Sequence, residues 1–120
     1  MYRVRVIKDF SSAHNLRGYE GNCENLHGHN WKVEAFLEGN NLDATGMLVD
    51  FKKLKRELKV IIDRLDHKYL NEMPPFDEIN PTSENISKYI FQELEKAFKE
   101  LVFKVRVWEN DDAAAEYIRD

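Results

Sequence analysis

The sequence predicts an α+β fold in which two helices cover one face of a four-stranded antiparallel sheet, in the order strand, strand, helix, helix, strand, strand. Apolar and polar residues alternate near both ends of the chain, as they do in half-buried strands. Two stretches between these ends carry apolar residues at steps of three and four, as amphipathic helices do. No internal repeat or Pro/Gly/Ser-rich linker divides the 120 residues, so we expect one domain over residues 1–120.

The composition narrows the class of protein. With 42% hydrophobic and 33% charged residues, the chain has the composition of an ordered globular protein. A net charge of −4 disfavours a general phosphate-backbone binder, so no nucleic-acid partner is expected. The chain has no apolar run long enough for a membrane span and does not open as a signal peptide. We therefore expect a cytoplasmic protein without a membrane partner.

Two strands are predicted in the first third of the chain. Apolar side chains recur at even-numbered positions from Tyr2 onward, with Lys8 as an exception, and this register reaches His14. Residues 15–26 carry glycines and asparagines without a period, which is typical of a loop. The alternation resumes over residues 31–38, so a second strand follows the loop.

Two helices are predicted in the middle of the chain. Asp50 is placed to cap the first helix, and Thr82, which follows the breaks at Pro74 and Pro75, is placed to start the second. The apolar stripe of the first helix comprises Phe51, Leu54, Leu58, Ile61, Ile62 and Leu65. The corresponding face of the second comprises Ile86, Ile90, Leu94, Ala97, Phe98 and Leu101.

The last part of the chain predicts a strand and a hairpin. Apolar residues alternate with charged ones over 103–107, and residues 110–112 form a turn sequence. The tail to Ile118 is expected to pair back as a fourth strand. The alternative is a helix, because Ala113 to Glu116 are good helix formers.

Three of the four histidines, namely His14, His27 and His29, fall near the facing ends of the first two strands. Period-two geometry directs His27 and His29 to the face that carries Trp31, and His14 stands in the matching register of the first strand. Three neutral imidazole nitrogens suit Zn²⁺ and leave a fourth position for water or substrate, as in catalytic zinc sites. The alternative is a His-Gly-His turn or surface pair without a metal.

Cys23 is the only cysteine, so it cannot form an intrachain disulfide. Its neighbours are polar residues or glycine, which is unusual around a buried core cysteine and favours a functional thiol: Gly21, Asn22, Glu24 and Asn25. A thiolate near a metal and histidines can act as a nucleophile or a base. Alternatively, Cys23 is a fourth ligand that closes a structural zinc site.

Two other places in the sequence carry candidate chemistry. Asp66 and His67 stand where the first helix loses its apolar stripe, and a bend between them would let the side chains meet and carry a proton. The alternative is an ordinary helix-end histidine favoured by the helix dipole. Glu109, at the end of the third strand, is either solvated or a buried carboxylate that accepts N–H donors from a flat heterocycle.

A series of motifs follows one order along the chain: Cys23-Glu24-Asn25-Leu26-His27-Gly28-His29, Gly46-Met47-Leu48-Val49-Asp50-Phe51, Leu65-Asp66-His67, Pro81-Thr82-Ser83-Glu84-Asn85 and Glu109. Together they resemble the 6-pyruvoyltetrahydropterin synthase / 6-carboxytetrahydropterin synthase family. The resemblance runs from Phe10 to Glu109 and implies the tunnelling fold (T-fold). It also implies a homohexamer, a dimer of trimers, with active sites between subunits.

The resemblance implies a zinc enzyme that acts on a pterin triphosphate. His14, His27 and His29 would hold Zn²⁺, and Cys23 would accept a proton from 7,8-dihydroneopterin triphosphate. The metal would acidify the side-chain hydroxyls of the substrate, and loss of triphosphate and carbon–carbon cleavage would follow.

The resemblance also implies roles for residues outside the zinc site. Asp66 and His67 would supply a proton relay with Cys23. Glu109 would anchor the pterin ring and join this relay. Thr82 and Ser83 would line the ring pocket.

The spacing around the cysteine bears on the product. The three residues between Cys23 and His27 resemble the 6-carboxytetrahydropterin synthases of the queuosine route, whereas animal pyruvoyl-forming enzymes have a longer gap. We therefore expect a lyase that forms 6-carboxy-5,6,7,8-tetrahydropterin, acetaldehyde and triphosphate. Glu24 stands where a folate-pathway branch carries a glutamate that forms 6-hydroxymethyl-7,8-dihydropterin, so it is a candidate substrate-binding residue and leaves a folate or dual activity open. A non-catalytic zinc or pterin-binding module is the alternative from another class.

Overall fold

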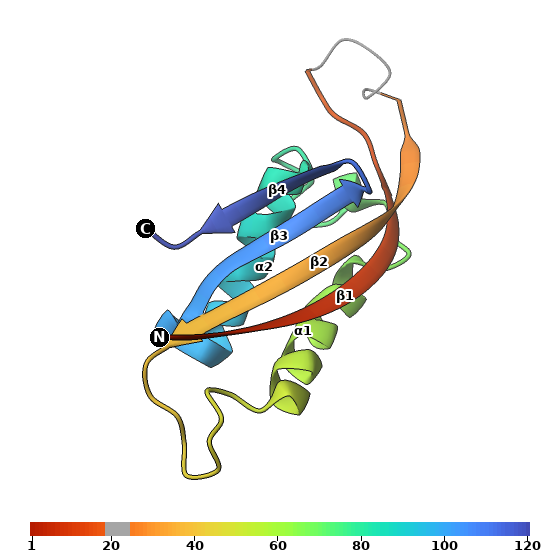
Figure 1. Cartoon of the computed structure of the whole chain (residues 1–120). Coiled ribbons are helices and arrows are strands. Elements are labelled where there is room, and N and C mark those ends of the chain that lie inside the picture. Colours follow the sequence, from red (N-terminus) through yellow and green to blue (C-terminus); the bar gives the residue numbers. More distant parts are fainter. Residues whose placement is uncertain (19–24) are drawn as a thin grey trace.

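The computed structural model describes residues 1–18 and 25–120. Its elements follow the predicted order (Figure 1): β1 Tyr2–His14, β2 His27–Gly39, α1 Phe51–Leu65, α2 Ser83–Phe98, β3 Val102–Asn110 and β4 Ala113–Ile118. There are also two 3₁₀ helices: η2 Leu70–Glu72 precedes α2 in the sequence, and η3 Lys99–Leu101 follows it. The predicted α+β class is confirmed. No helix among the described residues is both long and apolar enough to cross a membrane.

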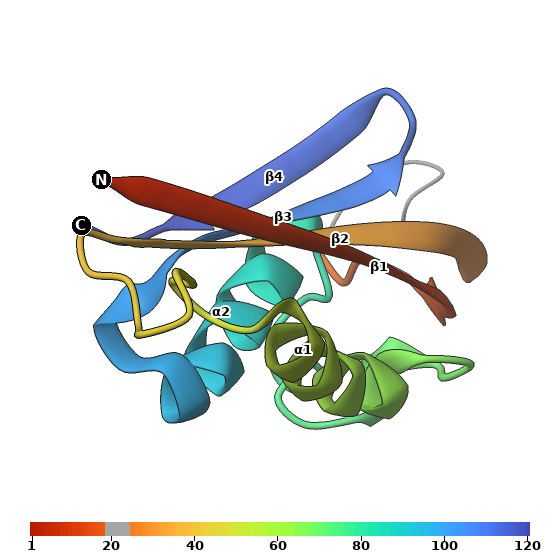
Figure 2. The same cartoon turned by 60° about the horizontal axis from the view of Figure 1, so that its bottom comes forward.

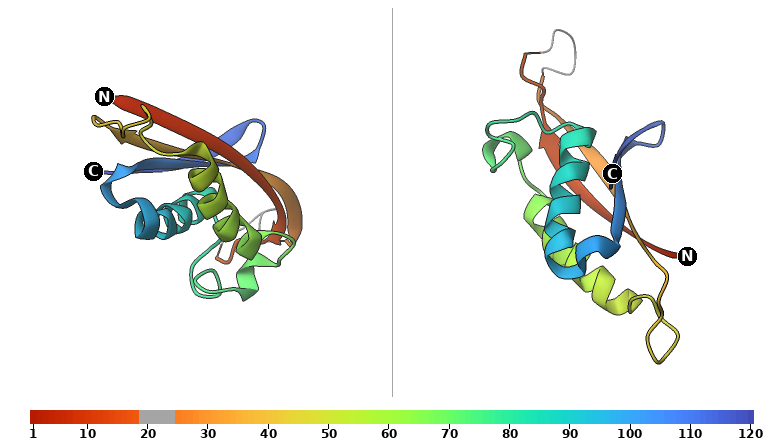
Figure 3. Two further views of the ribbon diagram at one scale, coloured as in Figure 1. Left: turned by 90° about the horizontal axis from the view of Figure 1, so that it is seen from below. Right: turned by 90° about the vertical axis from the view of Figure 1, so that its left-hand side faces the viewer.

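The four strands form one antiparallel sheet in the order β1-β2-β3-β4. Both helices pack on one face of this sheet, and the other face carries no helix (Figures 2 and 3). The core lies between the two layers, where β2 contributes the fully buried Trp31, Val33, Ala35 and Leu37. β1 and β4 form the two edges of the sheet.

The chain tail forms the predicted hairpin rather than a helix. β4 pairs with β3 from Ala113 to Ile118, and Tyr117 packs edge-on against Phe91 of α2 with ring centroids 4.9 Å apart. Sheet pairing and this packing outweigh the helix propensity of the alanines, because propensity is a weak preference beside tertiary contacts.

The helix boundaries confirm the predicted caps. The side chain of Asp50 accepts the backbone N–H of Lys52 at 2.8 Å, and that of Thr82 accepts the N–H of Asn85 at 3.1 Å. The predicted stripe of α1 is buried from Leu54 onward, but Phe51 is half exposed. Two predictions for α2 are also wrong. The helix ends at Phe98, so Leu101 lies in η3, and Ala97 is exposed whereas Phe91 is buried.

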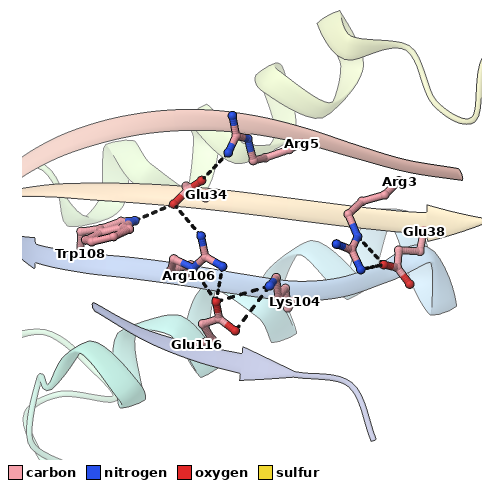
Figure 4. A network of polar contacts seen from close by, with 8 residues as sticks. All are labelled: Arg3, Arg5, Glu34, Glu38, Lys104, Arg106, Trp108 and Glu116. Carbon is pink, nitrogen blue, oxygen red and sulfur yellow. Dashed lines mark hydrogen bonds and ion pairs between the residues drawn. The ribbon is translucent and has the colours of Figure 1, made fainter. Parts of the chain in front are cut away.

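A network of polar contacts covers the face of the sheet that carries no helix (Figure 4). At its centre, the buried Glu34 accepts hydrogen bonds from Trp108 Nε1 at 2.6 Å and from Arg5 Nη1 at 3.0 Å. Arg106 lies 3.4 Å from the same carboxylate. Burial alone would raise the pKa of Glu34, but the Trp108 hydrogen bond and the charges of Arg106 and Arg5 outweigh it and hold this pKa below its ordinary value.

We expect Glu34→Gln to lower the free energy of unfolding by about 1–2 kcal/mol at neutral pH, because the charged hydrogen bonds of the carboxylate are lost. A depressed folded-state pKa stabilises the fold above the ordinary pKa of 4.5, and this stabilisation disappears as the pH falls through the folded-state value. The difference between wild type and variant should therefore shrink below about pH 4.5. Urea unfolding at several pH values measures it.

Glu38→Gln is the matched control, because Glu38 pairs on the same face with Arg3, whose side chain is half exposed. This surface pair is expected to contribute about 0–1 kcal/mol. An equal loss of unfolding free energy in the two variants would contradict the proposal that the Glu34 carboxylate stabilises the fold. A loss in Glu34→Gln that does not change with pH would contradict it as well.

Candidate metal centre and active site

The pairing of β1 and β2 brings three histidines together. His14 and His27 are Cα partners in this pairing, and His29 stands opposite Ser12. The ring centroids of His14 and His27 are 4.6 Å apart, those of His27 and His29 are 4.7 Å apart, and those of His14 and His29 are 5.3 Å apart. All three rings lie beside the core, with His14 and His29 edge-on to Trp31. The predicted convergence of the imidazoles on the helix-covered face is confirmed.

Backbone carbonyls orient two of these rings. Nδ1 of His14 lies 2.7 Å from the carbonyl oxygen of Pro81, and Nδ1 of His27 lies 2.7 Å from that of Asn25. A carbonyl only accepts, so each Nδ1 carries the proton and donates it. Each Nε2 then keeps its lone pair, which is the arrangement that metal-binding histidines use.

Glu109 completes the group. Its Oε1 lies 3.0 Å from Nε2 of His29, 3.2 Å from that of His14 and 3.8 Å from that of His27. The ligand atoms of the four residues lie within 4.8 Å of one another. We call His14, His27, His29 and Glu109 the histidine cluster.

The chemistry of the histidine cluster fits a divalent metal. Nε2 of His29 is buried and has no hydrogen-bond partner among the described residues, although Glu109 Oε1 is close to it. Burial lowers the pKa of His29, and the neighbouring His14 and His27 add to this effect while Glu109 opposes it. The neutral ring is the form that binds a metal, and three imidazole nitrogens are a donor set of catalytic Zn²⁺.

The position of Glu109 in this cluster did not emerge from the sequence, which suggested contact with a heterocycle instead. The signal was present in β3, where the buried Val105 and Val107 occupy the helix-covered face. Two residues further on, the same period brings Glu109 to that face. The alternation of buried residues along β3, which ends in a carboxylate, could thus have indicated Glu109 as the fourth member of the histidine cluster.

The cluster forms one wall of a pocket of about 220 Å³, which we call the cluster pocket. His14, His27 and Glu109 line it on the sheet side, and Thr82 and Ser83 line it at the start of α2. The structure therefore places the two residues expected near the pterin ring in the same pocket as Glu109.

Asp66 and His67 meet directly after α1. The backbone of His67 has a φ of 54°, and this bend brings its Nδ1 within 3.0 Å of Asp66 Oδ2. Asp66 Oδ1 accepts the backbone N–H of Ser11 at 2.9 Å. The Ser11 amide and then His67 hold the pKa of Asp66 below its usual value. The adjacent side chains thus form the hydrogen-bonded pair that the sequence suggested.

This pair does not lie in the cluster pocket. His67 is largely exposed and lines a second pocket, at the edge of the sheet, to which His29 is the one contribution from the histidine cluster. Ser12, buried beside His14 in β1, holds the end of α1 there, since its hydroxyl donates to the carbonyl of Leu65 and accepts the N–H of Lys68 at 3.1 Å. Cys23 and Glu24 lie outside the described residues, so their positions relative to either pocket stay predictions.

Comparison with known proteins decides the family. A model of the 6-pyruvoyl tetrahydropterin synthase family matches residues 3–120. The chain belongs to this family.

Relatives of the chain in the 6-pyruvoyl tetrahydropterin synthase family match it over most of their length. The putative 6-carboxy-5,6,7,8-tetrahydropterin synthase of Archaeoglobus fulgidus is 41% identical over 117 residues, which cover 97% of this chain and 95% of that protein. The 6-carboxy-5,6,7,8-tetrahydropterin synthase of Synechocystis is 37% identical over 119 residues, which cover 93% and 91%. The solved structure of the Caenorhabditis elegans 6-pyruvoyl tetrahydropterin synthase has a TM-score of 0.90 at 29% identity, covering 99% and 96%.

Membership confirms that the chain is an enzyme with the T-fold. Proteins of the 6-pyruvoyl tetrahydropterin synthase family are lyases with pterin substrates and depend in general on a metal. The histidine cluster is a group in this chain that could hold such a metal.

Proposed function

We propose that the chain is a zinc-dependent lyase that converts 7,8-dihydroneopterin triphosphate to 6-carboxy-5,6,7,8-tetrahydropterin, acetaldehyde and triphosphate, in the biosynthesis of queuosine and related 7-deazapurines. The observation that carries the proposal is the convergence of three imidazole Nε2 atoms and the Glu109 carboxylate, of which His14, His27 and Glu109 line the cluster pocket. The names and the high coverage of the two 6-carboxytetrahydropterin synthase relatives support the product.

In this proposal, three histidines bind the metal and Cys23 acts as the base. His14, His27 and His29 hold the metal, with His14 and His27 oriented by the carbonyls behind them. When bound, zinc supplies a Lewis acid that lowers the pKa of the substrate hydroxyls. Cys23 accepts the proton from the neighbouring carbon.

The other site residues position the pterin and move protons. Glu109 accepts N–H donors of the pterin ring beside Thr82 and Ser83, which line the same pocket. Asp66 fixes the ring orientation of His67 through the contact to Nδ1, so the other ring nitrogen can exchange a proton with Cys23.

We also propose that the enzyme is a homohexamer, a dimer of trimers, with active sites between subunits. His67 lines a different pocket from Glu109, so a complete site would draw on more than one chain. Exposed apolar side chains support an interface at the start of β1, where Tyr2, Met47 and Phe51 line a pocket of about 260 Å³. A second copy of the chain would cover them.

Mass spectrometry of the product tests the activity. Incubating the zinc-loaded enzyme with 7,8-dihydroneopterin triphosphate should give 6-carboxy-5,6,7,8-tetrahydropterin with one equivalent of acetaldehyde. A 6-hydroxymethyl product would support the alternative that Glu24, next to Cys23, suggests, and a 6-pyruvoyl product would match the name of the nematode relative. Binding of the pterin without any product would indicate a non-catalytic module.

A further inference from the structure

Ser12 is a buried polar residue of β1 to which the proposed function assigns no role, and it is only 6% exposed. Its hydroxyl donates to the carbonyl of Leu65 and accepts the N–H of Lys68 at 3.1 Å. A hydroxyl suits this position because it can donate and accept at the same time. One side chain therefore holds both ends of residues 65–68, which carry the proposed proton relay and which we call the relay turn.

The contact to Leu65 fixes the end of α1. The carbonyl of Leu65 is one of the last carbonyls of this helix, and these groups have no partner within a helix. Ser12 supplies a partner from a strand that lies 53 residues away in the chain. Removing the hydroxyl would take this partner from the Leu65 carbonyl and from the Lys68 N–H together.

The relay turn needs such support because its backbone is unusual at one residue. His67 has a φ of 54°, in the left-handed region that residues other than glycine adopt uncommonly, and such backbone persists where surrounding contacts fix it. The N–H of His67 donates to the carbonyl of Ser11 at 2.6 Å, and the N–H of Ala13 donates to the carbonyl of Lys68 at 2.9 Å. With the hydroxyl of Ser12 between them, these contacts dock the turn on three consecutive residues of β1.

Ser12 also belongs to the strands that carry the expected metal ligands. It stands opposite His29 in the pairing of β1 and β2, and its carbonyl accepts the indole N–H of Trp31 at 3.2 Å. His14 follows two residues later, on the same face of β1. The side chain of Ser12 thus contacts the relay turn, while its backbone is part of the sheet that holds the histidine cluster.

We propose that Ser12 is a positioning residue that fixes the relay turn, and with it the Asp66–His67 pair, relative to the histidine cluster. Its hydroxyl is taken up by two backbone groups, so it acts through the turn. Proton transfer requires hydrogen-bond distances, so a shift of the turn by about 1 Å would be enough to slow the relay. The inference rests on the proposed function for the role of Asp66 and His67, but the placement of the turn can be measured without turnover.

Amide hydrogen exchange in Ser12→Ala tests this placement without a substrate. Lys68 loses its direct partner and should exchange faster in any case. The informative amides are those of His67 and Ala13, because the substitution leaves their main-chain partners in place. We expect both to exchange about five- to tenfold faster than in wild type, because the turn opens more often without the hydroxyl.

Ser87→Ala is the matched control. Ser87 is likewise buried, and its hydroxyl donates to a backbone carbonyl, that of Glu84 at 2.7 Å, but this contact lies within α2. This variant should leave the exchange of the relay turn unchanged. Ser12→Thr keeps the hydroxyl and should restore what Ser12→Ala loses. Ser12→Cys, which has a side chain of similar size and a weak thiol donor, provides the same comparison if the alanine variant does not fold.

Turnover of the zinc-loaded enzyme tests the consequence for the reaction. Ser12→Ala should lower kcat about 10- to 100-fold, whereas KM and bound zinc should stay close to wild type, because the groups that hold substrate and metal are untouched. Equal kcat in Ser12→Ala and Ser87→Ala, or unchanged exchange at His67 and Ala13, would overturn the positioning role. Faster exchange in a protein that does not turn over the pterin would keep the placement of the turn by Ser12 and reject the proposed function.

Discussion

Replacing His29 with alanine is expected to weaken zinc binding by roughly 100-fold or more and to abolish turnover. Its Nε2 is a buried nitrogen without a hydrogen-bond partner among the described residues, and it faces the other two imidazoles. Removing a ligand should exceed the 10- to 100-fold loss that is typical for residues that only orient a ligand. Zinc per chain, measured by mass spectrometry after dialysis against a weak chelator, gives the affinity directly.

His67→Ala is the matched control for this measurement. It also removes one imidazole, but His67 lies outside the histidine cluster and contacts Asp66 instead. We expect this variant to keep its zinc, with circular dichroism confirming that both variants fold. Zinc retained at wild-type affinity in His29→Ala would show that the cluster is not the metal centre.

Replacing Cys23 with alanine is expected to leave zinc bound and to lower kcat by about 10²- to 10⁴-fold, the usual contribution of a general base. The measurement is turnover together with zinc content. A closed structural site with Cys23 as fourth ligand would behave differently, because metal and stability would be lost together. Glu24→Gln, at the adjacent position, shows whether the glutamate contributes to the same step.

Mixing the inactive Cys23→Ala and His67→Ala chains tests whether sites are shared between subunits. If His67 of one chain serves Cys23 of another, exchange of subunits should restore part of the activity, because some sites then contain both intact residues. Proven exchange without any recovery would place the complete relay within one chain.

The sequence was sufficient for the parts of the site that depend on strand period. His14, His27 and His29 were placed on one face by alternation alone, and the antiparallel register of β1 and β2 brings them together. The contact between Asp66 and His67 required a bend, which the positive φ of His67 supplies and which no sequence signal specified.

The sequence was insufficient where contacts join distant segments. Glu109 reaches the histidines because β3 pairs with β2, and Glu34 is buried on the face without helices because Trp108 and two arginines gather around it. Local propensity cannot show such contacts, since each depends on the pairing of strands far apart in the chain. The same limit applies to Phe51, which continues the helical period but lies beyond the covered face.

The hydrogen bond between His14 and Pro81 has a thermodynamic consequence. It joins the end of β1 to the residue before the cap of α2, two points 67 residues apart in the chain. A cation bound by His14 therefore also constrains the long chain segment between these two points. Part of the free energy of metal binding then stabilises the packing of the helices on the sheet. Metal binding to the histidine cluster and the thermal stability of the fold are therefore thermodynamically linked.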